Sequence, residues 1–70
     1  MAYGLDIANR FTFHPAQGDQ PERYERLRSA GREFAQLLTE LCPSSPELSR
    51  AVGHVDEAVM NANAAIARHN

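Results

Sequence analysis

Apolar side chains recur along two long stretches of this chain at intervals that alternate between three and four residues. In residues 20–41 the apolar positions are Tyr24, Leu27, Gly31, Phe34, Leu38 and Leu41. In residues 45–68 they are Leu48, Val52, Val55, Val59, Ala62 and Ile66. Because an α-helix completes one turn in about 3.6 residues, this spacing places each set along one helix face. The pattern predicts two amphipathic helices with heptad-like apolar seams.

The beginnings of both helices carry the same sequence signal. Asp19-Gln20-Pro21-Glu22 and Ser44-Ser45-Pro46-Glu47 each combine a cap residue, a first-turn Pro and a Glu three residues after the cap. These are the features of a capping box, in which two side chains satisfy free amides at the helix start. The link over residues 42–44 is short enough to require a tight antiparallel return. The predicted fold class is all-α: one domain over residues 1–70, an antiparallel two-helix hairpin after an N-terminal segment, residues 1–19.

The N-terminal segment is expected to contain no long helix, because glycines and Pro15 interrupt it, although residues 3–9 can form a turn or two. Residues 9–15, Asn-Arg-Phe-Thr-Phe-His-Pro, are expected to be extended, since the residue before a Pro avoids the helical region. Two roles are open for its rings: covering the open end of the hairpin, which we favour for Phe11, or stacking on a purine base beside His14, which is as well supported for Phe13.

A chain of 70 residues can bury only a small core, and its single cysteine, Cys42, cannot form an internal disulfide. Apolar and small residues also lie away from both seams. They are Ala30, Leu37, Ala51, Ala58, Ala65, Met60, Ala64 and Ala67. A single hairpin buries one stripe per helix, so these additional surfaces need another cover. We therefore expect a homo-oligomer.

The charge balance argues against binding to long nucleic acid, because 7 basic residues face 9 acidic ones and the net charge is −2. All the basic residues are Arg, and Arg23, Arg26, Arg28 and Arg32 lie close together in the first long helix. Pairing with Glu one turn away along that helix is the simpler interpretation. Bidentate binding of the phosphate of a small aromatic ligand is the alternative.

No residue pattern indicates an enzyme, a metal site or a cofactor. No His is spaced to activate Ser44 or Ser45, and His54 lacks the second His that a helical zinc site requires. The chain has no apolar run long enough for a membrane span, and MAYGLDIANR is unlike a signal peptide. We expect a cytoplasmic protein without catalytic groups.

Polar residues near the C-terminus suggest where a ligand would bind. Asn63 lies close to the seam and is expected to be half-buried, so its amide needs hydrogen-bond partners on another helix, another subunit or a ligand. An antiparallel hairpin returns the end of its second helix to the start of its first. Asn63, Arg68, Phe13 and the arginines of residues 23–28 are therefore expected at one end of the molecule.

Four blocks of this sequence resemble one phage family. They are Asn9-Arg-Phe-Thr-Phe-His-Pro15, Gln20-Pro-Glu-Arg-Tyr-Glu-Arg-Leu-Arg28, Glu40-Leu-Cys-Pro43 and Glu57-Ala-Val-Met-Asn-Ala-Asn-Ala-Ala-Ile-Ala-Arg68. Together they are similar to the small helical-hairpin domain shared by anti-CBASS and anti-Thoeris proteins. The resemblance implies a homohexameric sponge that sequesters cyclic nucleotide signals without cleaving them. It further implies cyclic dinucleotides held between protomers and, in some members, cyclic trinucleotides at separate sites.

The resemblance also implies roles for particular residues. Phe13, or less favourably Phe11, would stack on a base, and Arg26 or Arg28 would contact phosphate. The cyclic-nucleotide site expected on these grounds consists of Phe13, His14, Arg23, Arg26, Arg28, Asn63 and Arg68. The chain departs from the family pattern at Phe13, where Tyr is usual, and at Asn61, where Trp is frequent. Both departures concern ligand choice more than the fold.

The leading hypothesis is therefore a phage anti-defence sponge for cyclic di- and trinucleotides, located in the cytoplasm of the infected bacterial host. A structural helical hairpin that oligomerises or docks on a protein, with no nucleotide ligand, is the alternative. A small nucleic-acid-binding regulator is a third hypothesis, which the net charge of −2 weakens.

Overall fold

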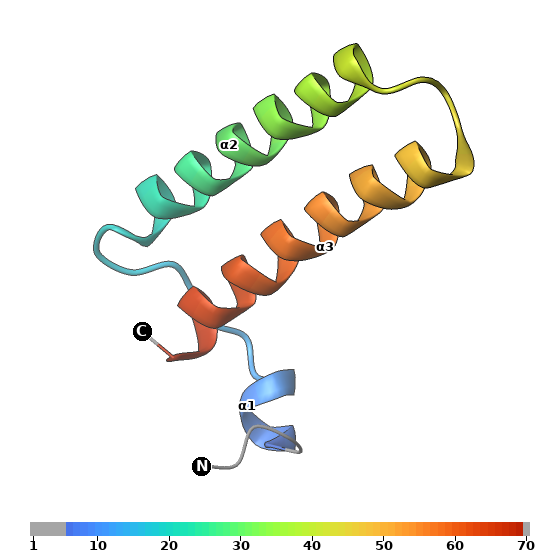
Figure 1. The fold of residues 1–70 in the computed structure, drawn as a ribbon. Coiled ribbons are helices and arrows are strands. Elements are labelled where there is room, and N and C mark those ends of the chain that lie inside the picture. Colours follow the sequence, from blue (N-terminus) through green and yellow to red (C-terminus); the bar gives the residue numbers. More distant parts are fainter. Residues whose placement is uncertain (1–5, 70) are drawn as a thin grey trace.

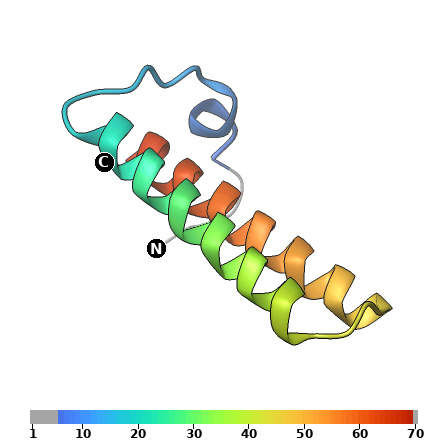
Figure 2. The ribbon, with the colours of Figure 1, turned by 90° about the horizontal axis from the view of Figure 1, so that it is seen from above.

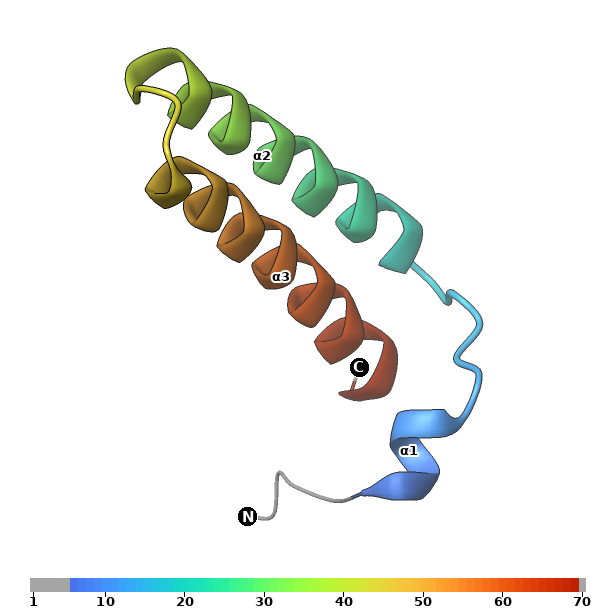
Figure 3. The same ribbon diagram turned by 90° about the vertical axis from the view of Figure 1, so that its right-hand side faces the viewer.

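A computed structural model describes residues 6–69, and in this range the chain forms three helices and no strand. They are α1 (Ile7–Phe11), α2 (Gln20–Leu41) and α3 (Pro46–His69). Helices α2 and α3 run antiparallel and side by side, and α1 lies beyond the open end of this hairpin (Figures 1 and 3). The predicted all-α hairpin is confirmed. Helix α2 spans the predicted residues, and α3 begins and ends one residue later than residues 45–68.

The starts of the long helices differ from the two predicted capping boxes. Helix α3 is capped by Ser45, not Ser44: the Ser45 hydroxyl oxygen accepts a hydrogen bond from the Leu48 N–H at 3.1 Å. Asp19 occupies the cap position of α2, but its side chain makes no capping hydrogen bond. Its carboxylate instead lies 3.2 Å from Nε of Arg23, a cation one turn along the same helix. The capping-box pattern located the starts of both helices, but the hydrogen bonds that it predicted for the cap side chains are wrong.

The stretch predicted to be extended is partly helical. Asp6 caps α1, because its Oδ1 accepts a hydrogen bond from the Asn9 N–H at 3.2 Å. This capping stabilises one short turn, and the backbone becomes extended only at Thr12. The Phe11 side chain is 83% exposed, so the expectation that it covers the open end of the hairpin is wrong for the single chain. Of the turn expected over residues 3–9, residues 3–5 lie outside the described part.

The contact between α2 and α3 leaves its apolar seam only half-buried. No hydrophobic side chain among residues 6–69 is buried, and Gln20, 3% exposed, is the buried polar residue of this range. Gln20 links the two helices at their open end, since its Nε2 donates to the carbonyl oxygen of Ile66 at 3.3 Å. The segment between α1 and α2 passes the end of α3 (Figure 2). This arrangement brings residues 12–18 close to the C-terminal turns of α3.

Gly31 allows the two helices to approach closely. A Cβ atom built at this glycine would lie 2.6 Å from Cγ2 of Val59 on α3. Optimal carbon–carbon contacts are about 3.5–4.0 Å, and a β-branched side chain has little freedom to rotate away. Gly31 therefore sets the spacing of the hairpin.

We expect Gly31→Ala to destabilise the protein by up to about 2 kcal/mol, because an overpacking cost of about 1–3 kcal/mol outweighs the helix-propensity gain of about 1 kcal/mol. Thermal unfolding followed by circular dichroism measures the change. Gly53→Ala is the matched control, since a Cβ at Gly53 meets nothing within 4 Å. It should raise the melting temperature; equal losses at both positions would contradict the role of Gly31.

Candidate functional site

A pocket of about 470 Å³ lies at the open end of the hairpin, where the N-terminal segment meets both long helices. Its lining residues are Arg10, Thr12, Phe13, His14, Tyr24, Arg28, Asn63, Ala64, Ala67 and Arg68. The first four come from the last turn of α1 and the extended stretch after it, and the others come from α2 and the C-terminal half of α3. The pocket therefore exists only when three separate parts of the chain come together.

The structure divides the predicted site residues between two places. Phe13, His14, Arg28, Asn63 and Arg68 all line the pocket at the open end. By contrast, Arg23 and Arg26 line a separate pocket of about 380 Å³. Arg23 Nε is at ion-pair distance from Asp19, 3.2 Å, without the alignment of a hydrogen bond. The two arginines point elsewhere because they lie at other angles around α2 than Arg28.

The aromatic side chains of the pocket differ in how they are held. Phe13 is 83% exposed in the extended stretch after α1. Tyr24, which the apolar spacing assigned to the seam, is half-buried and contributes a second ring to the pocket wall. A ring that is exposed to solvent can stack on the flat face of a base without giving up packing contacts within the protein. Phe13 is thus available for stacking on a ligand.

The charge around the pocket favours an anion. Arg10, Arg28 and Arg68 line it, and none of the described lining residues is acidic. Arg28 lies 3.4 Å from Glu25, but its side chain is 55% exposed, so this surface ion pair holds it only weakly. Guanidinium groups bind phosphate oxygens through paired hydrogen bonds. An anionic ligand can therefore bind Arg28 at little cost in free energy from breaking the Arg28–Glu25 ion pair.

Asn63, which lines the same pocket, carries an unsatisfied acceptor. Its Oδ1 atom is buried and accepts no hydrogen bond from the described residues. A buried polar atom without a partner costs about 1–3 kcal/mol, so a donor is expected from outside this part of the chain. The N–H group of a ligand or of another subunit meets that requirement. The site can thus recognise a ring that carries a hydrogen-bond donor.

Asn9 connects the N-terminal segment to α3, and the sequence analysis assigned it no role. Its Nδ2 donates to the Arg68 carbonyl oxygen at 3.3 Å, and its own carbonyl oxygen lies 2.9 Å from Nε2 of His14. The Arg68 guanidinium in turn donates to the Arg10 carbonyl oxygen at 3.4 Å. His14 and Arg68 therefore hold the segment in place as well as lining the pocket. The partners of Asn9 lie up to 59 positions away, so no local pattern could have identified them.

The remaining residues show what chemistry is present. Among residues 6–69 no group of three or more His, Cys, Asp and Glu side chains could hold a metal ion. Ser45 serves as a helix cap, and the Thr12 hydroxyl donates to the carbonyl oxygen of Ala8. In the same range no helix combines the length and apolar character needed to cross a membrane. The arrangement at the open end is suited to binding an anionic aromatic ligand.

Comparison with known proteins identifies the family. The sequence model described as "Acb2/Tad1, hairpin domain" matches residues 5–67. Because this match covers nearly the whole chain, the protein belongs to the Acb2/Tad1 hairpin family, and the resemblance to the anti-CBASS and anti-Thoeris sponges is confirmed. Comparisons with curated proteins and with solved structures found no match.

We expect Asn9→Ala to loosen α1 from the end of α3, because the substitution removes the hydrogen bond from Nδ2 to the Arg68 carbonyl oxygen. A net hydrogen-bond contribution of about 0.5–1.5 kcal/mol corresponds to roughly two- to thirteenfold faster amide exchange in α1. Hydrogen–deuterium exchange measures this effect. Asn61→Ala is the control, since the Asn61 amide bonds only within its own helix, to the Glu57 carbonyl oxygen at 2.9 Å. Unchanged exchange in Asn9→Ala would contradict the assignment.

Proposed function

We propose that this member of the Acb2/Tad1 hairpin family is a phage anti-defence sponge that binds cyclic oligonucleotide immune signals and leaves them intact. Family membership is consistent with that role. The observation that carries the proposal is the pocket at the open end, which combines an exposed ring, arginines and an unsatisfied acceptor. Cyclic dinucleotides, and by extension cyclic trinucleotides, present bases, ring N–H donors and phosphates to these groups.

Each group of the pocket suits one part of such a ligand. The Phe13 ring stacks on a base, and the Asn63 Oδ1 atom accepts a hydrogen bond from a base N–H. Arg28 binds a phosphate; its place in the pocket favours it over Arg26, which lines a different pocket. Arg68 and His14 form the wall that holds the Phe13 stretch. Arg23 and Arg26 contribute only where a second site or a neighbouring protomer meets their pocket.

Sequestration requires less of the protein than catalysis. A sponge needs tight binding of the ground state, whereas an enzyme must bind the transition state more tightly than the substrate. Stacking and phosphate contacts bind both states alike, and the Thr12 hydroxyl and His14 Nε2 of the pocket each meet a backbone carbonyl oxygen instead of each other. We therefore propose binding without cleavage, in the cytoplasm of the infected host, where cyclic nucleotide signals act.

Self-association is part of the proposal. A hairpin with no buried hydrophobic side chain among its described residues gains little stability alone, and Phe34, Leu37, Leu41 and Met60 expose between 46% and 74% of their surface. Covering them with further copies of the chain supplies the missing core. The family resemblance favours a homohexamer, in which a neighbouring protomer closes the open side of the pocket.

An oligomerising or protein-docking hairpin without a nucleotide ligand is the second candidate, and the apolar face between α2 and α3 is the observation that favours it. Calorimetric titration with a panel of cyclic di- and trinucleotides separates the two functions, with duplex DNA as the control. Saturable heat with at least one cyclic nucleotide and none with DNA supports the sponge. No heat with any member of the panel would contradict it.

We expect Phe13→Ala to weaken binding of the cyclic nucleotide by about 1–3 kcal/mol, or roughly five- to over a hundredfold, because it removes base stacking. Phe13→Tyr keeps the aromatic face and should retain affinity, whereas Phe13→Leu should lose most of it.

Arg28→Ala should weaken binding of the cyclic nucleotide by about 1.5–3 kcal/mol and reduce the salt dependence of binding. Arg50→Ala is the matched control, since Arg50 pairs with Glu47 outside the pocket. Equal affinities of Phe13→Ala and the unaltered protein would place the site elsewhere.

Native mass spectrometry is expected to show an assembly whose mass includes the intact cyclic nucleotide. The assembly should be a hexamer at micromolar concentration, because the exposed apolar side chains need cover. Heating the complex should then release the ligand uncleaved, as chromatography against the starting nucleotide can show. A linear product in the released fraction would identify an enzyme, and a monomer at micromolar concentration would contradict the proposed self-association.

A further inference from the structure

Helix α1 presents an apolar pair on the side that faces away from its own hairpin. Ile7 and Phe11 are four residues apart and therefore share one helix face. Asn9, midway between them, lies about 200° around the helix from Ile7, and its side chain bonds to α3. The pair points outward as a result, with Ile7 62% and Phe11 83% exposed. A five-residue helix holds two large apolar side chains in solvent.

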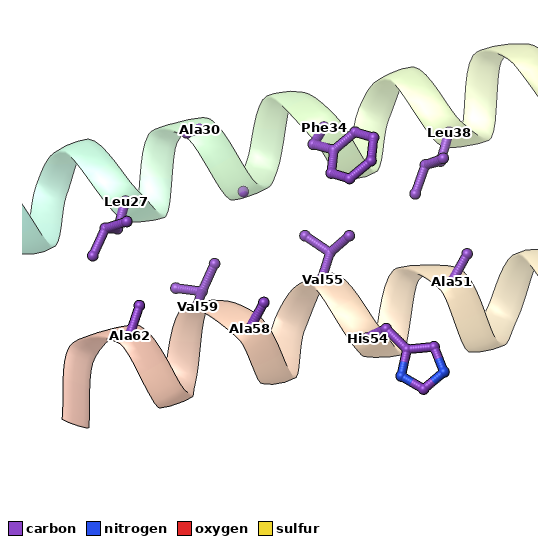
Figure 4. Close-up of a pocket in the computed structure, with 11 residues that line it drawn as sticks. Leu27, Ala30, Phe34, Leu38, Ala51, His54, Val55, Ala58, Val59 and Ala62 are labelled. Carbon is purple, nitrogen blue, oxygen red and sulfur yellow. The ribbon is translucent and has the colours of Figure 1, made fainter. Parts of the chain in front are cut away.

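A long apolar groove follows the seam on one face of the hairpin. It encloses about 640 Å³ and is lined by Leu27, Ala30, Gly31, Phe34, Leu38, Ala51, His54, Val55, Ala58, Val59 and Ala62. In Figure 4 Leu27 and Leu38 of α2 and Val55 and Val59 of α3 project into the space between the two helices, and the His54 ring points away from α2. Gly31 and the alanines have no side chain or a small one, so they leave the bottom of the groove unfilled. The groove can therefore accept large apolar side chains from outside.

We propose that α1 of one protomer inserts Ile7 and Phe11 into this groove on a neighbouring protomer. The inference rests on the self-association proposed above and specifies which two surfaces meet. The occupant is a second copy of this chain, because the chain itself carries both an outward apolar pair and an apolar groove without cover. One contact covers both surfaces.

Helix α1 cannot occupy the groove of its own chain. The hydrogen bonds from Asn9 Nδ2 to the Arg68 carbonyl oxygen and from the Arg68 guanidinium to the Arg10 carbonyl oxygen hold α1 beyond the open end of the hairpin. The groove runs along the middle of the hairpin (Figures 1 and 3). Packing of one groove against the same groove of a second chain would cover Phe34 but would leave Ile7 and Phe11 in water. The proposed contact joins two different surfaces, so two chains can exchange it reciprocally about a twofold axis, or it can repeat from chain to chain and close into a ring.

The proposed contact also connects assembly with the nucleotide site. Phe13 follows Phe11 by two residues and lines the pocket at the open end. A neighbour that holds Phe11 must therefore lie beside Phe13 and border the same pocket. Each protomer thus contributes the wall that closes the site of the next.

Disulfide cross-linking tests which surfaces meet. In chains whose exposed Cys42 is replaced by Ser, Phe11→Cys is combined in turn with Ala30→Cys, Ala51→Cys, Ala58→Cys or Ala62→Cys. Under mild oxidation at least one combination should give linked dimers or a longer ladder of linked chains on a non-reducing gel, since a disulfide requires Cα atoms within about 7 Å. Phe11→Cys with Thr39→Cys, at an exposed position of α2 outside the groove, is the control and should give only background. Each single-cysteine chain should remain unlinked.

A second measurement needs no cross-link. Phe11→Ala should raise the concentration for half-assembly by about tenfold or more, the effect expected of an aromatic anchor. Arg50→Ala, at a side chain 65% exposed and outside the groove, should leave that concentration within about threefold.

The outcomes separate this contact from the proposed function. Cross-linking of the single groove cysteines to themselves would show groove-to-groove packing and overturn the proposal. Assembly without any linked chains, and with Phe11→Ala assembling normally, would also overturn it while leaving self-association intact. Calorimetry on the reduced variants reports nucleotide binding separately, so a chain that binds its ligand as an isolated monomer refutes this contact without refuting the sponge.

Discussion

Two helices that pack only on each other can cover each apolar seam from one side, and this constraint governs the whole molecule. The hairpin brings α2 and α3 together at Gly31, where a Cβ atom would lie 2.6 Å from Val59, yet no hydrophobic side chain among residues 6–69 is buried. Burial of apolar surface is the main favourable term in folding. Much of the free energy that burial of its apolar side chains could supply is therefore not gained in a single chain. Further copies of the chain are the natural source of cover for these side chains.

The open end of the hairpin is held by a different kind of contact. Gln20, Asn9 and Arg68 connect the N-terminal segment, α2 and α3 through side-chain to backbone hydrogen bonds across long sequence separations. Each such bond contributes only about 0.5–1.5 kcal/mol, so the segment is positioned without being rigidly packed. Polar contacts thus define the candidate binding pocket, whereas apolar contacts define the hairpin and its association. The two properties can be altered separately by substitution.

Much of the fold followed from local patterns, because the periodicity of an amphipathic helix is visible along a single chain. The spacing of three and four residues located α2 and α3, and the short link required their antiparallel return. That topology in turn predicted that Phe13, Arg28, Asn63 and Arg68 would lie at one end, and these four side chains line one pocket. The same reasoning placed Arg23 and Arg26 there as well, because helix position alone does not decide which face meets a distant segment.

The sequence by itself determined the two long helices, the hairpin and the family, since these depend on repeat spacing, cap residues and ordered motifs. Only the tertiary structure decided the conformation of the N-terminal segment. Its capped turn holds Asn9 against the Arg68 carbonyl and sends the exposed Phe11 ring outward, contrary to the extended conformation expected for residues 9–15. The physical reason is the range of the contacts: the hydrogen bonds of a helix join residues four positions apart, whereas the partner of Asn9 lies 59 residues away and only the hairpin brings it near.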